Sequence, residues 1–396
     1  MTDQDLVGQR IRALAELLGM SRTRLAESVG ATPAQLSKIE SGIQRFPLDL
    51  AAAMAEKHGV PLAFFTQNDP AHEAAVPTFR KKARASALDQ KRITRLAREA
   101  ARVFTQASTQ TGYKPFVFTD DKDLLDDVEQ VALEVRRAAG IADDAPVPNV
   151  TRALERQGIA VINGLDPNTE RTLDLSGISL PTRHDQRPLV ALVSNLPGAV
   201  ARFTLAHEAA HHIWDQDLPS PITSTKDHRE LRAHHFAGAF LLPKQQVIAR
   251  ITEQTTLRGY LPVKADYGVS VGAIIMRCRN LGIISSNRAR SLQIQLSSLG
   301  WRDPDIEPVP VADERPLLLK QALKRATLTG GPALGTYTGL PPHLVRHWAR
   351  LDPPTNPADS GADIIDLATR RRHSRTTPHM KGTTHDPGIR VGDHHA

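Results

Sequence analysis

The residues best suited to chemistry in this sequence are two histidines and a glutamate at 207–211, in the order His-Glu-x-x-His. If this segment is a helix, His207 and His211 project from one face, one turn apart, and can bind a single Zn²⁺. Glu208 is offset by one position, so its carboxylate can lie beside the metal without ligating it and can deprotonate a water that the metal activates. A surface helix that carries these residues by chance is the alternative, and a third ligand would decide between the two.

The elements around this motif can be predicted from its neighbours. Residues 202–214 lack internal proline and glycine and carry regularly spaced apolar residues, which indicates a helix. A strand directly before this helix could hold an extended peptide along its edge by main-chain hydrogen bonds. We expect a helix at 149–157, strands at 158–162, 177–180 and 188–194, and a second long helix at about 229–242 that ends at Pro243.

The two long helices together resemble a known family. Residues 202–211, followed by the Glu-x-x-Ala, Phe-Ala and Leu-Leu-Pro patterns of residues 230–243, are similar to the ImmA/IrrE family of zinc metallopeptidases. The resemblance implies that Glu230 is the third zinc ligand. Two histidines and one carboxylate leave an open position for water, as catalytic zinc sites do.

His234 departs from that family, which usually has asparagine here. It follows Glu230 by four residues, so both lie on one helix face. His234 could support a ligand without touching the metal, close the site as a fourth ligand, donate a hydrogen bond to the transition state, or make no contact with the metal at all.

The chemistry that the resemblance implies is zinc-assisted hydrolysis of a peptide bond. The metal lowers the pKa of water toward about 7. Glu208 would take the proton as general base and deliver it to the leaving amine. Three side chains are candidates to stabilise the oxyanion: Tyr260, Tyr267 and His234.

The first 66 residues carry short amphipathic helical patterns separated by glycine and proline. Gly19 ends the first helix, Ser21 caps the second, and Thr32 caps the third, which has Pro33 at its first position. Two short helices with a tight turn between them predict a helix-turn-helix unit. Residues 22–30 and 36–42 resemble the XRE-type, lambda-repressor-like DNA-binding domains, which implies that 32–41 is the recognition helix.

The outward face of that helix suggests how DNA is read. Gln35 and Ser37 could contact base edges, although Gln35 could also serve only as part of the cap. Arginines nearby could meet phosphates or simply be solvated. We expect a homodimer that binds double-stranded operator DNA with an affinity that falls steeply with salt. The candidate DNA-binding residues are Arg22, Arg24, Thr32, Ala34, Gln35, Ser37, Lys38 and Arg45.

Residues 67–80 have the composition of a linker, and from Phe79 onward the chain is basic. Helical periodicity over 93–104 places much of this charge on a helix, where it could extend the DNA footprint or, as a simpler interpretation, form a solvated face. The net charge of +7 and the pI of about 9.6 suit a nucleic-acid partner without requiring one.

Length and composition set further limits. A chain of 396 residues can form two or three domains. The single cysteine, Cys278, excludes an intrachain disulfide and a cysteine-based zinc site. The sequence shows neither a signal peptide nor an apolar stretch of transmembrane length, so we expect a cytoplasmic protein without a membrane partner.

We therefore predict a mainly α fold with a small β-sheet (α+β). An all-helical helix-turn-helix domain (1–66) precedes connecting helices (67–148), a minimal zincin-like metallopeptidase domain (149–260), a helical carboxy-terminal part (261–352) and a disordered tail (353–396). The predicted function is a transcriptional regulator whose peptidase cleaves a regulator, either its own chain or a partner. The alternatives are a repressor without proteolysis, which uses the peptidase fold as a sensor or dimerisation module, and an antitoxin-like regulator. The presence of the His-Glu-x-x-His motif together with Glu230 favours peptidase activity, because a protein that used this fold only as a scaffold would need neither.

Overall fold

The computed structural model describes residues 6–68, 75–81, 86–113, 115–116, 122–168, 175–181, 187–216, 218–222, 224–327 and 331–351. Helices dominate these residues and enclose one small sheet, which confirms the expected α+β class. The tail that we expected to be disordered from residue 353 lies outside them. Among the described helices, none has both the length and the apolar character needed to cross a membrane.

The amino-terminal segment has the helices that the sequence predicts. Gly19 ends the first helix with φ at 64°, in the left-handed region that favours glycine. The side chains of Ser21 and Thr32 accept hydrogen bonds from the backbone N–H groups of Arg24 and Gln35, so they cap the second and third helices as expected. The elements are α1 (Gln9–Leu18), α2 (Arg22–Ser28), α3 (Pro33–Glu40), α4 (Leu48–His58) and the 3₁₀ helix η2 (Leu62–Thr66).

The sheet has four strands in the order β1-β3-β4-β2. Strands β2 (Ala160–Asn163) and β4 (Leu189–Leu192) are parallel, whereas β3 (Leu175–Ser179) is antiparallel to both β4 and β1 (Thr78–Lys81). Two expectations are wrong here. The predicted linker ends in strand β1, and β4 is bonded on both sides, so the strand before the motif helix has no free edge for a peptide. The outer strands are β1 and β2.

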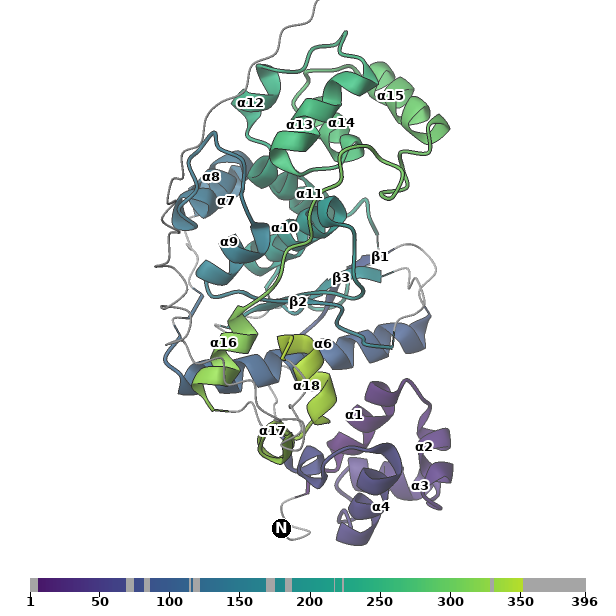
Figure 1. Cartoon of the computed structure of the whole chain (residues 1–396). Helices are drawn as coiled ribbons and strands as arrows, with labels where there is room; N and C mark the ends of the chain where they lie inside the picture. The colour runs from purple at the N-terminus through teal and green to yellow at the C-terminus, as the bar shows by residue number, and fades with distance from the viewer. Residues whose placement is uncertain are drawn as a thin grey trace, which may run out of the picture. The chain divides into compact units, whose positions relative to one another are not determined.

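Helices cover both faces of this sheet, and the strand residues alternate accordingly. Val190 and Leu192 pack with α9 (Val150–Arg156) and α10 (Gly198–Trp214), while Leu189 and Ala191 pack with the core on the opposite face. Figure 1 shows α6 on that opposite face, together with α16 and α18. These three helices are α6 (Ala87–Gln110), α16 (Leu318–Arg325) and α18 (Pro342–Ala349).

A second layer of helices packs on α10. Helix α11 (His228–Leu241) lies along it, and α8 (Val128–Ala138) and α14 (Val271–Asn280) contact α11 in turn. The remaining elements are α7 (Lys122–Asp126), α12 (Lys244–Ile248), η3 (Leu257–Tyr260), α13 (Leu261–Tyr267), α15 (Ser286–Ser298) and α17 (Gly331–Thr338).

The basic helix α6 is not the solvated face, or the free DNA-binding face, that its charge suggested. Glu99, in its middle, is buried and accepts from Arg10 of α1 at 2.6 Å and from Arg102 at 2.8 Å. Burial by itself raises the pKa of Glu99, but the charges of Arg10 and Arg102 outweigh it and hold that pKa well below its usual range.

Two further arginines of α6 form ion pairs away from their own helix. Arg95 pairs with Glu16 of α1 at 2.8 Å, and Arg92 pairs with Asp166 at 2.8 Å. The positive charges of α6 therefore join the amino-terminal helices to the sheet-bearing part of the chain.

Candidate metal centre and nucleic-acid interface

The motif helix α10 is buried along most of its length because it lies between the sheet and α11. Small side chains permit this close approach. Ala206 and Ala210 of α10 and Ala233 and Ala237 of α11 are all almost inaccessible to solvent. Side chains from both helices can therefore reach one shared point.

Three side chains meet at that point with the spacing of zinc ligands. The Nε2 atoms of His207 and His211 are 3.3 Å apart. Glu230 places one carboxylate oxygen 3.3 Å from Nε2 of His207 and the other 3.7 Å from Nε2 of His211. Two ligand atoms at about 2.0–2.1 Å from one tetrahedral ion are separated by about 3.3–3.4 Å. The three residues thus fit a single Zn²⁺.

His234 borders this group. Its ring meets that of His207 with centroids 4.6 Å apart, and one of its ring nitrogens lies within 4.8 Å of ligand atoms of both His207 and Glu230. Its ring also lies beside that of Phe203, with centroids 5.7 Å apart. His234 therefore groups with His207 and Glu230 as a candidate further ligand, and its role as a fourth ligand stays open.

Asp215, at the carboxy-terminal end of α10, fixes the ring of His211. One carboxylate oxygen lies 2.7 Å from Nδ1 of His211, and the other accepts from Arg232 of α11 at 2.6 Å. Because a carboxylate can only accept, Nδ1 carries the proton and Nε2 is left for a metal. Burial lowers the pKa of His211, but the hydrogen bond to Asp215 and the charge of Glu208 outweigh this effect and raise it.

Glu208 lies on the sheet side of α10 and is buried. Its Oε2 accepts hydrogen bonds from Ser179 of β3 at 2.9 Å and from Thr78 of β1 at 3.3 Å. Gly177 of β3 faces the same carboxylate, and a Cβ at this position would lie 3.0 Å from Cγ of Glu208 and 2.6 Å from Cγ2 of Thr204. The strands therefore hold the carboxylate in one place.

The other candidates from the sequence fall outside this cluster. Tyr267 donates to the carbonyl of Asp144 at 3.2 Å, and the hydroxyl of Tyr260 is buried near Cys278. Burial raises the pKa of both tyrosines and raises that of Cys278 to about 12. Among the three oxyanion candidates, only His234 borders the ligands.

Sequence reasoning missed Thr78, Ser179 and Asp215. Asp215 did leave a signal, because it follows His211 by four residues on one helix face. Thr78 and Ser179 left none, because they reach Glu208 only through the pairing of β1 with β3.

Helix α3, the expected recognition helix, presents most of the predicted DNA-binding side chains to solvent. Ala34, Ser37 and Lys38 are exposed, and Gln35 is half-buried. Within the described part of the chain, the side-chain amide of Gln35 makes no hydrogen bond to Thr32, the residue that caps α3. The amide is therefore available for other contacts. Outside α3, Arg24 and Arg45 are also exposed.

Arg22 differs from the other predicted phosphate contacts. It forms an ion pair with the buried carboxylate of Glu40 at 2.9 Å, although its own side chain is 43% exposed. The hydroxyl of Thr32 likewise serves as the cap of α3. These two side chains are held by the domain itself.

Comparison with known proteins identifies both segments. Residues 11–65 match the helix-turn-helix family, and residues 155–279 match the IrrE N-terminal-like domain of the M78 peptidases. Two curated relatives, uncharacterized HTH-type transcriptional regulators from Sinorhizobium medicae (strain WSM419) and Rhizobium meliloti (strain 1021), are each 38% identical over 64 residues. That match covers 16% of this chain and 46%, or about half, of each relative. No solved structure matches. The chain therefore carries an XRE-type helix-turn-helix domain at 11–65 and an IrrE N-terminal-like domain of the M78 peptidases at 155–279.

Proposed function

We propose that the chain is a DNA-binding transcriptional regulator whose IrrE-like domain is a zinc-dependent endopeptidase that cleaves a regulator protein, either itself or a partner. One observation carries the peptidase half of this proposal. The ring nitrogens of His207 and His211 and the carboxylate oxygens of Glu230 lie 3.3–3.7 Å apart, close to the separation of about 3.3–3.4 Å between ligands of one tetrahedral ion.

Each residue of the cluster has a part in hydrolysis. His207, His211 and Glu230 would hold Zn²⁺, which when bound acts as a Lewis acid and lowers the pKa of water. Glu208 accepts the proton and passes it to the leaving amine, while the hydroxyls of Thr78 and Ser179 keep its carboxylate in place.

Two histidine contacts complete the arrangement. Asp215 keeps Nε2 of His211 available by holding the proton on Nδ1. We propose that His234, which groups with His207 and Glu230, donates a hydrogen bond to the oxygen on which charge develops.

Two features favour an active peptidase over a scaffold. Glu208 is a carboxylate buried beside the ligands, and burying such a group is costly unless it is hydrogen-bonded. Two strands supply the hydroxyls that stabilise it. A sensor or dimerisation module would need neither the acid nor its partners.

The DNA half of the proposal rests on the exposed face of α3. In this proposal Gln35 and Ser37 read bases, and the exposed Lys38, Arg24 and Arg45 contact phosphates. We expect a homodimer on a two-fold symmetric operator in the cytoplasm, because helix-turn-helix units are commonly paired on such sites.

The decisive experiment compares the wild-type chain with Glu208→Gln. Zinc content is measured by mass spectrometry of the purified protein, and cleavage is followed both in the chain itself and in added regulator proteins. We expect about one zinc per chain in both proteins, and a loss of cleavage of about 10²–10⁴-fold in the variant. Glu134→Gln, at a partly exposed position on α8 where the carboxylate pairs with Arg137, is the matched control. Cleavage that persists in Glu208→Gln, or that needs no zinc, would refute the assignment.

A further inference from the structure

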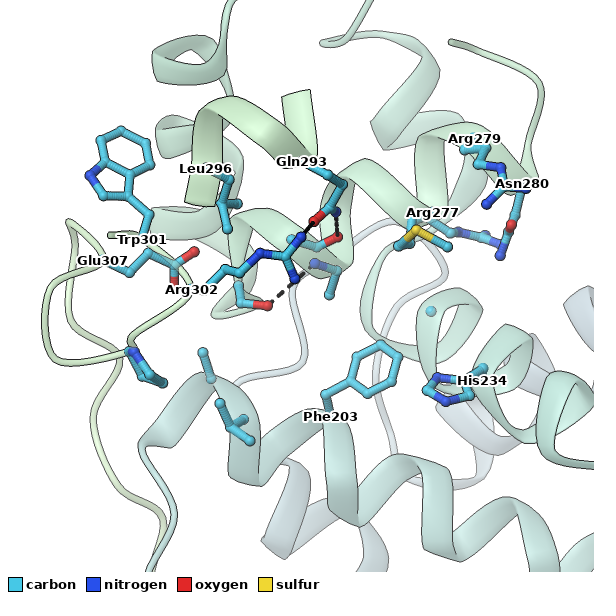
Figure 2. Close-up of a pocket in the computed structure, with 18 of the residues that line it drawn as sticks. Phe203, His234, Arg277, Arg279, Asn280, Gln293, Leu296, Trp301, Arg302 and Glu307 are labelled. Atoms are coloured by element: carbon cyan, nitrogen blue, oxygen red, sulfur yellow. Dashed lines mark hydrogen bonds between the residues drawn. The ribbon is translucent and has the colours of Figure 1, made fainter. Parts of the chain in front are cut away.

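A pocket of about 710 Å³ begins one helical turn from the proposed metal ligands. Phe203 precedes His207 by four residues on α10, and His234 follows Glu230 by four on α11; Figure 2 shows the two rings side by side at the pocket wall. One helical turn rises about 5.4 Å, and an extended peptide advances about 3.3–3.6 Å per residue. The pocket is therefore within reach of a side chain one or two residues from the bond that the site would cut.

The walls of this pocket are largely apolar and come from four helices and the segment after α15. Leu231 and Met276, which both line the pocket, leave 47% and 40% of their surfaces exposed, which is unusual for large apolar side chains. Across from Phe203, Figure 2 shows Leu296 of α15 and Trp301. The large apolar side chains of the lining are Val200, Phe203, Leu231, Met276, Leu296 and Trp301.

The free charge in the pocket is positive. Its carboxylate, Glu307, is neutralised by Lys264 at 2.6 Å and accepts from the backbone N–H of Val271 at 2.7 Å. Arg277 is likewise paired, with Glu129. Two cations remain, Arg279 and Arg302.

These two cations are exposed at the pocket. Arg279 forms no hydrogen bond or ion pair with any described residue. Among the described residues, Arg302 bonds only to the uncharged side chains of Ser297 and Gln293. An occupant with negative charge would therefore be attracted here, and a basic one repelled.

We propose that this pocket is the specificity subsite of the peptidase, and that it selects peptides in which a bulky apolar residue stands next to aspartate or glutamate. The apolar side chain fills the space between Phe203, Met276 and Leu296, and the carboxylate lies against Arg279 or Arg302. This inference rests on the proposed peptidase function and names its class of substrate.

Binding is tested apart from cleavage, on the full-length, zinc-loaded Glu208→Gln protein by calorimetry. The probe is the blocked hexapeptide Gly-Asp-Leu-Leu-Asp-Gly, compared with one peptide in which lysine replaces both aspartates and another in which serine replaces both leucines. We expect the probe to bind at least tenfold more tightly than either, with an affinity that weakens as salt increases.

Variants locate the binding. Arg279→Glu should lower the affinity for the acidic probe by about tenfold and raise the affinity for the lysine peptide. Arg290 is an exposed arginine of α15 outside the pocket, so Arg290→Glu should change neither affinity. Ala273→Phe, which fills the pocket, should lower the affinity for the probe. The circular dichroism spectrum and melting temperature of this variant report whether it still folds.

The outcomes distinguish a failure of the subsite proposal from a failure of the peptidase proposal. Probe binding with the expected charge swap, in a wild-type chain that cleaves nothing, would support the subsite while refuting the peptidase. Equal binding of the acidic and basic peptides, or an unchanged affinity in both pocket variants, would overturn the subsite even if the wild-type chain hydrolyses other peptides.

Discussion

A carboxylate oxygen of Asp215 lies 2.7 Å from Nδ1 of His211, while the second oxygen of Asp215 binds Arg232 on the neighbouring helix at 2.6 Å. One acid thus orients a proposed zinc ligand and ties α10 to α11. The contact between the two helices that carry the ligands and the orientation of His211 therefore both depend on the side chain of Asp215.

Replacing Asp215 should therefore weaken metal binding without removing a ligand. We expect Asp215→Asn to lower zinc affinity by about 10–100-fold, because the imidazole loses the partner that sets its tautomer and orientation. Competition with a chelator of known affinity measures the change. Asp303→Asn, at an exposed position in the segment after α15, is the control, and zinc affinity equal to wild type in Asp215→Asn would contradict the role.

Gly177 should tolerate no side chain, because a Cβ there would lie 2.6 Å from Thr204 and 3.0 Å from Glu208. We expect Gly177→Ala to cost about 1–3 kcal/mol of unfolding free energy, as overpacking does, and to reduce cleavage by moving the carboxylate.

The matched control for Gly177 is Gly272 in α14, where a Cβ would meet nothing closer than 3.9 Å. Gly272→Ala should be neutral or stabilise the fold by up to about 1 kcal/mol, since alanine favours helix. Urea unfolding of both variants measures the two changes in unfolding free energy. A Gly177→Ala variant as stable as the wild type would contradict the prediction.

The proposed zinc ligands could be brought together from the sequence because their arrangement depends on local order. His207 and His211 share a face through helical periodicity alone, and Glu230 is reached through the family resemblance of the next helix. The caps at Ser21 and Thr32 were predictable for the same reason, since each bonds within three residues of itself.

What could not be predicted depends on distant pairing. Strand β1 is only four residues long and follows a stretch rich in turn-forming residues, so its sequence does not stand out from a linker. The hydroxyl of Thr78 meets Ser179, 101 residues away, only once that strand has paired. The arginines of α6 were likewise interpreted as solvated because two of their acidic partners, Glu16 of α1 and Asp166 after β2, lie more than 70 residues away in the sequence.

Glu99 should contribute stability that persists into mildly acidic solution. We expect Glu99→Gln to lower the free energy of unfolding by about 3–5 kcal/mol at pH 7, because the substitution leaves the guanidinium groups of Arg10 and Arg102 buried without their carboxylate.

The pH dependence of that difference has a definite sign. Because the folded-state pKa of Glu99 is depressed, its contribution is complete above the unfolded pKa of about 4.3 and declines as the pH falls below it. Unfolding of wild type and variant at pH 7, 5 and 3 measures the difference. A gap that widens on acidification would contradict the depressed pKa.

The two arginines near the start of the helix-turn-helix unit should behave differently toward DNA. Arg24 is exposed and Arg22 is held by Glu40. We expect Arg24→Gln to weaken operator binding and to reduce the slope of log affinity against log salt by about 0.9, the value for one phosphate contact. Arg22→Gln should change the slope less and the stability of the domain more. Fluorescence anisotropy over a salt series measures both, and equal slopes for the two variants would contradict the distinction.

Strand β1 also has a mechanical consequence. Residues 67–77 connect the last turn of the amino-terminal helices to Thr78, the same residue whose hydroxyl reaches Glu208. Separation of β1 from β3 would remove the Thr78 hydrogen bond from Glu208, while the ion pairs of α6 would still hold the amino-terminal helices. The chain that leaves the helix-turn-helix domain thus directly supports the proposed general base.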